Sequence, residues 1–352
     1  MADKPNGKEN HGALTVLGRA AAFLGVTLFF VLAAVLGVVY VMEKGPSPTM
    51  TATFCRSMRE TSAIRWIPDI FLSEEEIAQF KSESTETAET ESVNPSLIHV
   101  SAAAVSEEES AAGGTGLELI EISEGTLKGK LLIVDDPRRV ILGTSDNMGY
   151  QAGMQLTELT AKYGAVAGIN AGGFNDENGR GNGGIPQGLV ITEGELVWGR
   201  SDTLYNIVGL DNDGILQVGT MTGTEALERG MRYAVSFVTH DGLASALIIN
   251  GEVQTRNLAS GVNPRTAIGQ REDGALLLLV LDGRSINTLG ATMGNVCDVM
   301  LEYGAVNAGN LDGGSSTVMV YEGEIINSCA SVTGPRNIPT AFVVLPEDEA
   351  NG

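Results

Sequence analysis

The sequence predicts an α+β domain of mixed and antiparallel sheets with a few helices and an internal pseudo-two-fold repeat, preceded by one transmembrane helix. A long uncharged apolar stretch near the N-terminus indicates the membrane helix. From Leu117 onward, short runs of Val, Ile and Leu alternate with Gly, Asn and Asp turns, which is typical of strands and hairpins. Two similar segments 140 residues apart indicate the repeat. Because helices are few between these strands, a regular alternation of strand and helix is not expected.

Residues 20–42 carry no charged side chain. A helix rises about 1.5 Å per residue, so this stretch would span roughly 34 Å and cross a hydrocarbon core of about 30 Å. A cleaved signal peptide has a shorter apolar region that ends in small residues, whereas this one ends in Val39-Tyr40-Val41-Met42. We therefore expect an uncleaved anchor. Basic residues precede it, which predicts a cytoplasmic tail at residues 1–19 and a cell-membrane protein whose remainder is extracytoplasmic.

Residues 43–81 are expected to form a helical stalk beside the membrane. Apolar side chains recur at helical spacing there, and Ser73 followed by Glu76 forms a capping box. The stalk could stiffen the chain against the membrane or dock a partner, and we favour the first. Residues 82–116 are mostly Ser, Thr, Glu, Ala and Gly, which predicts an acidic flexible tether, since they offer little apolar surface to offset the entropy of ordering.

The folded domain is predicted over residues 117–347. Strands, several with an internal hairpin turn, are expected at 117–122, 130–135, 140–143, 165–170, 188–198, 207–218, 247–255, 266–282, 316–326 and 340–345. Helices are expected at 155–163, 224–236 and 295–303.

The repeat aligns Tyr163-Gly164-Ala165-Val166 with Tyr303-Gly304-Ala305-Val306 and matches six of twelve positions without a gap. In each copy a helix precedes a strand that ends at an Asn, and a glycine-rich loop and a hairpin follow. Two such loops could converge on one cleft. Alternatively, the glycines only make turns.

Composition excludes several classes of function. The net charge of −22 leaves no basic stripe for nucleic acid, so no nucleic acid is expected as a partner. The three cysteines lack metal-binding spacing, and Cys297 and Cys329 could form a disulfide or remain buried thiols, the second being favoured. No zinc, phosphate-loop or nucleophile-elbow motif is present. We expect no cofactor, although the acidic loop Asp176-Glu177-Asn178-Gly179 offers oxygen ligands suited to calcium without the full spacing of a calcium loop.

The remaining polar residues lie in glycine-rich loops, an inventory suited to a sugar or a sugar phosphate. The stretches are Asn170-Ala171-Gly172-Gly173-Phe174, Asn263-Pro264-Arg265-Thr266-Ala267-Ile268-Gly269, Leu281-Asp282-Gly283-Arg284, Asn310-Leu311-Asp312-Gly313-Gly314-Ser315-Ser316-Thr317 and Arg336-Asn337-Ile338-Pro339-Thr340. In this order they resemble the phosphodiester glycosidase family from Leu117 to about Pro346. The family often has a third glycine after the aspartate, where this chain has Ser315.

The resemblance implies hydrolysis of the bond between an anomeric carbon and a phosphate that is itself esterified. Such a phosphate leaves readily, so charge neutralisation by arginine could replace a full general acid. Arg265 is our first choice, followed by Arg284 and Arg336, and a structural salt bridge is the alternative for each. Asp312 is the expected catalytic carboxylate and Asp282 the second. Either aspartate could instead only shape its turn.

The same loops supply the expected substrate-binding residues. Asparagine amides would bond sugar hydroxyls, glycines would let backbone amides approach the phosphate, and a phenylalanine would pack on a sugar face or in the core. The set is Asn170, Gly172, Gly173, Phe174, Thr266, Arg284, Asn310, Gly313, Gly314, Ser315, Ser316, Arg336 and Asn337.

The expected function is that of an extracytoplasmic hydrolase that cleaves a sugar from a sugar 1-phosphodiester, with a phosphodiester-linked glycan or cell-envelope polymer as partner. It would contact the membrane through residues 20–42, and its oligomeric state is open. The alternative is a non-catalytic glycan-binding module that assists cell-envelope or exopolysaccharide assembly. A purely structural stalk protein is a third reading, which the clustered Asn, Asp and Arg motifs disfavour.

Overall fold

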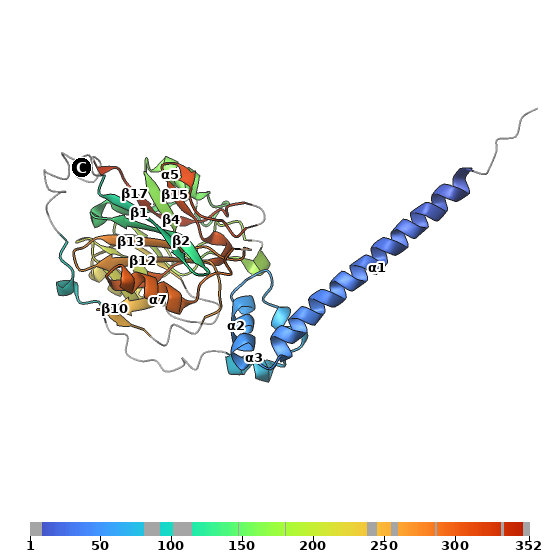
Figure 1. Cartoon of the computed structure of the whole chain (residues 1–352). Coiled ribbons are helices and arrows are strands. Elements are labelled where there is room, and N and C mark those ends of the chain that lie inside the picture. Colours follow the sequence, from blue (N-terminus) through green and yellow to red (C-terminus); the bar gives the residue numbers. More distant parts are fainter. Residues whose placement is uncertain are drawn as a thin grey trace, which may run out of the picture.

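The computed structural model describes residues 9–80, 92–100, 115–146, 148–179, 181–237, 245–254, 260–285, 287–331 and 334–347. Helix α1 (Glu9–Lys44) leads away from the rest of the chain (Figure 1). Within the described residues it is the one helix long and apolar enough to cross a membrane, over Val16–Lys44, with a mean hydropathy of 2.7. By length and composition it is an N-terminal apolar helix of the kind found in membrane anchors and signal sequences.

Residues 48–80 form a compact helical unit between α1 and the sheets, as Figure 1 shows. It contains α2 (Pro48–Arg59), a short 3-10 helix (Ile67–Ile70) and α3 (Glu74–Phe80). The predicted capping box is present, because Ser73 N donates to Glu76 and Glu76 N donates to the Ser73 hydroxyl. The unit has its own small apolar core of Cys55, Leu72 and Ile77, and an ion pair between Lys44 and Glu76 ties it to the end of α1.

The domain contains three sheets, and every strand pairing described in them is antiparallel. The predicted α+β class is therefore confirmed. The seven-stranded sheet has the order β1 (Leu117–Glu124), β2 (Leu127–Val134), β13 (Leu276–Leu281), β12 (Arg265–Arg271), β14 (Ala305–Asn310), β10 (Ala246–Ile249) and β11 (Glu252–Val253). One five-stranded sheet has the order β16 (Glu324–Ile325), β15 (Met319–Tyr321), β4 (Ala167–Asn170), β17 (Thr340–Val344) and β3 (Val140–Thr144). The other has the order β6 (Glu195–Trp198), β5 (Val190–Thr192), β9 (Met231–Ser236), β7 (Leu204–Asp211) and β8 (Leu216–Thr222).

The three sheets share one central core, and one helix covers the outer face of each. Helix α7 (Met293–Glu302) covers the seven-stranded sheet, α5 (Leu156–Lys162) covers the sheet of β4, and α6 (Gly223–Glu228) covers the sheet of β9. Strand β13 shows why its sequence is an unbroken apolar run. Its even-numbered residues face the central core and its odd-numbered residues face α7, so both faces are buried.

The segment 224–236 differs from its prediction as one helix. Helix α6 ends at Glu228, and β9 follows at Met231–Ser236. Gly230, with φ of 74°, breaks the helix, and β9 then pairs with β5 and β7 on its two sides. Strand partners distant in sequence therefore outweigh the local helical pattern.

Two further predictions concern the tether and the cysteines. Residues 92–100, inside the stretch predicted as a flexible tether, lie against the domain and bury Val93 and Ile98 in its central core. Most of the remaining tether, 82–91 and 101–114, lies outside the described residues. Cys297 and Cys329 are both free thiols in the structure.

The internal repeat places two loops together. Helix α5 and strand β4 form one unit, α7 and β14 the other, and the two strands lie in different sheets. Beyond the ends of these strands, Asp312 N donates to Ala171 O at 3.0 Å. The convergence that the repeat predicted is therefore confirmed.

Candidate functional site

A cavity of about 470 Å³ opens where these two loops meet, a volume within the range of about 300 to 1,000 Å³ common for small-molecule sites. The loops that follow β4, β13 and β14 form part of its wall, and the residues directly after α2 form another part. The lining residues are Glu60, Thr61, Ser62, Ala63, Arg65, Phe174, Asn175, Asp176, Glu177, Gly179, Gln187, Phe237, Asn263, Arg265, Arg284, Asp312, Gly313, Gly314, Ser315, Ser316, Ala330, Ser331 and Arg336.

Asp312 projects from the loop that follows β14. Its main-chain oxygen accepts a 2.5 Å hydrogen bond from the Asn170 side chain, which holds the loop against the end of β4. Removal of water from around the carboxylate raises its pKa to about 7, although the Ser316 hydroxyl, Arg336 and the Gly313 amide oppose the rise. A carboxyl group with this pKa changes charge near neutral pH, as a catalytic acid or base requires.

Arg336 lies near Asp312 and pairs with a different carboxylate. Its Nη2 lies 2.8 Å from Oδ1 of Asp176, and its Nη1 donates to the Ser315 hydroxyl at 3.1 Å. The guanidinium also lies over the Phe174 ring, 5.1 Å from the ring centroid. Arg336 therefore joins the loops that follow β4 and β14 and places a cation at the cavity wall.

Arg265 forms a buried ion pair with Glu60, a residue 205 positions away at the end of α2. The two side chains are 6% and 7% exposed, and Nη2 of Arg265 lies 2.7 Å from Oε2 of Glu60. The same carboxylate accepts hydrogen bonds from Gly261 N and from the Asn263 side chain, so both of its oxygens are satisfied. The charge of Arg265 is neutralised within the protein.

Arg284 has no carboxylate partner among the described residues. Its Nη2 donates to the Thr61 hydroxyl at 2.6 Å and to Oδ1 of Asn263 at 2.8 Å, and the residue is exposed to the solvent of the cavity. Its backbone has a φ of 55°, a left-handed conformation that is uncommon for a residue other than glycine and that often occurs at functional sites. Of the three arginines predicted from the sequence, Arg284 is the one whose charge no carboxylate of the described residues neutralises directly.

Nine of the predicted site residues line the cavity: Phe174, Arg265, Arg284, Asp312, Gly313, Gly314, Ser315, Ser316 and Arg336. The others do not. Asn170 and Asn310 are each 1% exposed, and Thr266, which is fully buried, donates to Asn170. Gly172, Gly173 and Asn337 are not among the lining residues, and Asp282 instead accepts hydrogen bonds from Asn327 and Ser328. The carboxylate near Asp312 is that of Asp176, which raises the pKa of Asp312, and not that of Asp282.

The segment that follows α2 contributes to the cavity, which was not predicted from the sequence. Five consecutive or nearly consecutive residues of it, Glu60, Thr61, Ser62, Ala63 and Arg65, line the cavity. Their pattern resembles any polar helix end, so no local signal distinguished them. Asp176 was noted only as part of a calcium-like loop. Its carboxylate pairs with Arg336, and no group of three or more His, Cys, Asp or Glu among the described residues could hold a metal ion.

Taken together, the site presents a carboxyl group of pKa near 7 beside arginines in a ligand-sized cavity. Such a set can bind an anionic substrate and act on a carbon next to the anion.

Residues 163–345 match the family described as phosphodiester glycosidase. The catalytic domain of zebrafish N-acetylglucosamine-1-phosphodiester alpha-N-acetylglucosaminidase, auto-inhibited by its pro-peptide, has a similar fold, with a TM-score of 0.57 and 19% identity over 74% of this chain and 88% of that one. A Synechocystis protein of known structure is 17% identical, with a TM-score of 0.46, over 66% of this chain and 61% of that one.

A curated relative is the SPbeta prophage-derived uncharacterized protein YomE of Bacillus subtilis. It is 36% identical over 89 residues, which cover 25% of this chain and 14% of that protein. The chain therefore matches only a small part of the length of this relative.

Proposed function

Since the chain belongs to the phosphodiester glycosidase family, we propose that it hydrolyses sugar 1-phosphodiesters, of which N-acetylglucosamine linked through phosphate to a second group is the leading candidate. The observation that carries the proposal is the position of Asp312, whose pKa is about 7, in a ligand-sized cavity that also holds Arg284 and Arg336. A carboxylate and accessible cations are the groups that cleavage between an anomeric carbon and a phosphate requires.

In the proposed reaction, the bond between the anomeric carbon and the phosphate oxygen breaks. The ionised carboxylate of Asp312 attacks the anomeric carbon or removes a proton from the attacking water, and its charge stabilises the oxocarbenium-like transition state. The electron pair of the broken bond stays on the phosphate oxygen. Water supplies a hydroxyl group to the sugar and a proton to balance the reaction, so the products are the free sugar and a phosphate monoester.

The three arginines would have different roles in the reaction. Arg284 would bind the phosphate oxygens, because it lines the cavity and its guanidinium is hydrogen-bonded to Thr61 and Asn263 without a carboxylate partner in the described structure. Arg336 would remain paired with Asp176. From this position beside Asp312 it would stabilise the negative charge that develops on the departing phosphate. Arg265 was the first choice from sequence. Its ion pair with Glu60 supports a role in holding the wall of the site.

We place the enzyme at the cell membrane, with residues 20–42 as a single-pass anchor, the N-terminus in the cytoplasm and the domain outside. Support comes from α1, whose side chains over the span are largely exposed, as expected for lipid contact. The substrate would then be a phosphodiester-linked glycan or a cell-envelope polymer. A glycan-binding module without catalysis would use the same cavity, and the experiment below separates the two.

The test uses the full-length protein in detergent or nanodiscs, with the methyl ester of α-N-acetylglucosamine 1-phosphate in oxygen-18 water, followed by mass spectrometry. We expect the label in the released sugar, because the bond at the anomeric carbon breaks. Label in the phosphate would indicate a phosphodiesterase. Binding of the ester without turnover, across a panel of sugar phosphodiesters, would indicate the glycan-binding module.

A further inference from the structure

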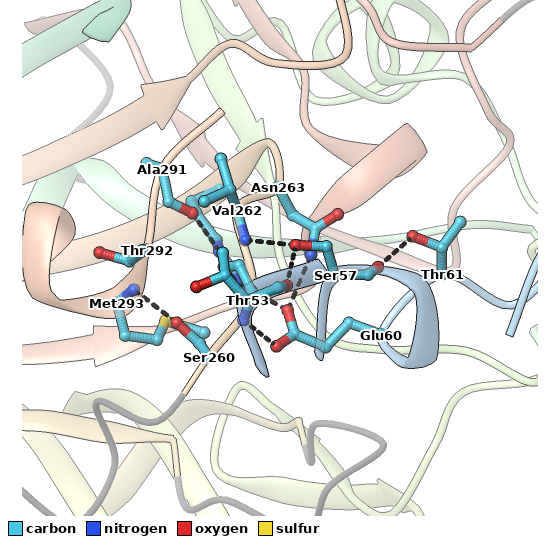
Figure 2. A network of polar contacts seen from close by, with 12 residues as sticks. Thr53, Ser57, Glu60, Thr61, Ser260, Val262, Asn263, Ala291, Thr292 and Met293 are labelled. Carbon is cyan, nitrogen blue, oxygen red and sulfur yellow. Dashed lines mark hydrogen bonds and ion pairs between the residues drawn. The ribbon is translucent and has the colours of Figure 1, made fainter. Parts of the chain in front are cut away.

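The end of α2 docks on the cavity through contacts that join it to two separate loops of the domain. The Ser57 hydroxyl accepts a hydrogen bond from Val262 N at 2.8 Å, and the Asn263 side chain donates to Glu60 at 2.9 Å (Figure 2). A Cβ atom on Gly261 would lie 2.2 Å from Ser57 N, and one on Gly179 would lie 2.8 Å from the Ala63 Cβ. The segment therefore fits against glycines that leave no room for a side chain.

The docked segment holds both arginines that flank it. Glu60 receives hydrogen bonds from Arg265, Gly261 N and the Asn263 side chain, all between 2.6 and 2.9 Å. The Thr61 hydroxyl donates to Ser57 O at 3.0 Å and accepts from Arg284 at 2.6 Å. Because the main chain of α2 orients this hydroxyl, the position of the Arg284 guanidinium depends on the segment.

The cavity stays open with the segment in place. Its volume is about 470 Å³ with Glu60, Thr61, Ser62, Ala63 and Arg65 in its wall, and that volume suits a sugar phosphate. Arg284 and Asp312 both line this remaining space. A segment that blocked the site would be expected to fill the space around these two side chains.

We infer that juxtamembrane residues 60–65 are a permanent wall of the substrate site, in which Thr61 and Glu60 are positioning residues for Arg284 and Arg265. The inference deepens the proposed function and rests on it for its kinetic readout. It means that the sheet domain without the stalk has an incomplete site. It also means that the site is held close to α1, since the unit containing α2 and α3 is fastened to the end of α1 by Lys44 and Glu76.

The first test replaces Thr61 in the full-length protein. Thr61→Ala removes a hydrogen bond to a charged group, so we expect KM for the sugar phosphodiester to rise at least about fivefold with a smaller change in kcat. Thr61→Ser keeps the hydroxyl and should restore KM. Thr49→Ala is the matched control, because Thr49 is an exposed threonine in the first turn of α2 and does not line the cavity.

The second test displaces the segment without changing a side chain that faces the substrate. The backbone of Gly261 lies outside the left-handed region, and the three atoms that an alanine Cβ would approach most closely all belong to the docked Ser57. Gly261→Ala should lower kcat/KM at least about tenfold and raise hydrogen exchange in residues 57–65. Gly294→Ala is the control, since its Cβ would meet only the Thr292 hydroxyl, at 3.5 Å.

A binding measurement separates this inference from the proposed function. Isothermal titration with N-acetylglucosamine 1-phosphate should give weaker binding for Thr61→Ala and Gly261→Ala than for the wild type, by at least about fivefold. Weaker binding by both variants, in a protein that hydrolyses no diester, would support residues 60–65 as a wall of the binding site. The same result would reject the proposed hydrolysis.

Three results would overturn the inference. Faster turnover or tighter binding in either variant would make the segment a cover that competes with substrate. Unchanged turnover and binding in both variants would make it a passive tether. Continued protection of residues 57–65 in Gly261→Ala would show that the close approach at Gly261 does not govern docking, and would likewise count against the wall.

Discussion

Asn170 and Asp312 lie 142 residues apart in the chain, and the side-chain amide of Asn170 donates a 2.5 Å hydrogen bond to the main-chain oxygen of Asp312. The other end of the same amide accepts from Val318 N and from the Thr266 hydroxyl. One buried side chain thus joins the ends of two sheets where the loop that carries Asp312 begins.

Asn170→Ala should therefore affect both stability and activity. The substitution leaves the Asp312 main-chain oxygen and Val318 N without their partner, each at about 1 to 3 kcal/mol, while the Thr266 hydroxyl keeps Thr317, so we expect a loss of at least about 2 kcal/mol in the free energy of unfolding. Activity should fall as well, because the loop that carries Asp312 loses its tie. Urea denaturation and kinetics would measure both, with exposed Asn212→Ala as the control. Equal stability of the two variants would contradict the role of Asn170.

Asp312→Asn should lower the rate at least about 100-fold with the fold intact, because the ionised carboxylate is lost while its shape remains. Steady-state kinetics and circular dichroism would check this. Asp213→Asn, at an exposed hairpin turn, should leave the rate unchanged. Near-normal turnover by Asp312→Asn would remove Asp312 from the catalytic role.

The pH dependence of the rate should reflect the pKa of Asp312. If the reaction needs the ionised carboxylate, kcat/KM should rise with pH and level off above an inflection near pH 7. This inflection should disappear from the residual activity of Asp312→Asn. An inflection near pH 4, the ordinary range for aspartate, would show that Asp312 is not the titrating group.

The free energy of unfolding should fall as pH rises, in contrast to kcat/KM. The pKa of Asp312 is raised in the folded state, from 3.8 to about 7, so its contribution to stability is fully present below pH 4 and is lost as pH rises through about 7. The free energy of unfolding of the wild type should therefore fall, relative to that of Asp312→Asn, between pH 4 and pH 8. Denaturation curves of both proteins over this range would measure the difference, and parallel curves would contradict the raised pKa.

Arg284→Ala should reduce kcat/KM at least about tenfold, chiefly through KM, because the cation that binds the phosphate is removed. Arg284→Lys should recover little, since an ammonium group cannot form the paired hydrogen bonds of a guanidinium. Arg232→Ala, in a partly exposed ion pair with Glu193 away from the cavity, is the control. An unchanged KM in Arg284→Ala would assign the phosphate to another group.

Arg265→Ala should also lower the rate at least about 100-fold, and it should destabilise the docked segment. The substitution leaves Glu60 buried without its charge partner, which typically costs about 3 to 5 kcal/mol. Urea-induced unfolding, together with hydrogen exchange of residues 57–65, would detect this destabilisation. A normal rate, with residues 57–65 still protected, would show that the ion pair is dispensable.

Several features of the site were predictable because local sequence encodes them. The loops after β4 and β14 follow apolar strands, end in glycines and recur at a fixed spacing, so Asp312, Phe174 and the glycines beside them could be assigned to a common cleft. The roles of the asparagines were less predictable from the sequence. Asn170 looks like a sugar ligand in the sequence, but its hydrogen bonds go to Asp312, Thr266 and Val318. Whether a polar side chain faces a ligand or the core depends on partners that are distant in sequence.

By itself, the sequence determined the apolar helix, the α+β class, the family and most of the loops that meet at the cavity, because each leaves a local pattern of composition or spacing. Only the tertiary structure decided the strand at Met231–Ser236, the pairing of Arg336 with Asp176 and the docking of Glu60 and Thr61 on the site. These depend on contacts between residues far apart in the chain. A buried carboxylate pairs with whichever guanidinium the fold brings to it, and no sequence pattern around Glu60 predicts Arg265 as its partner.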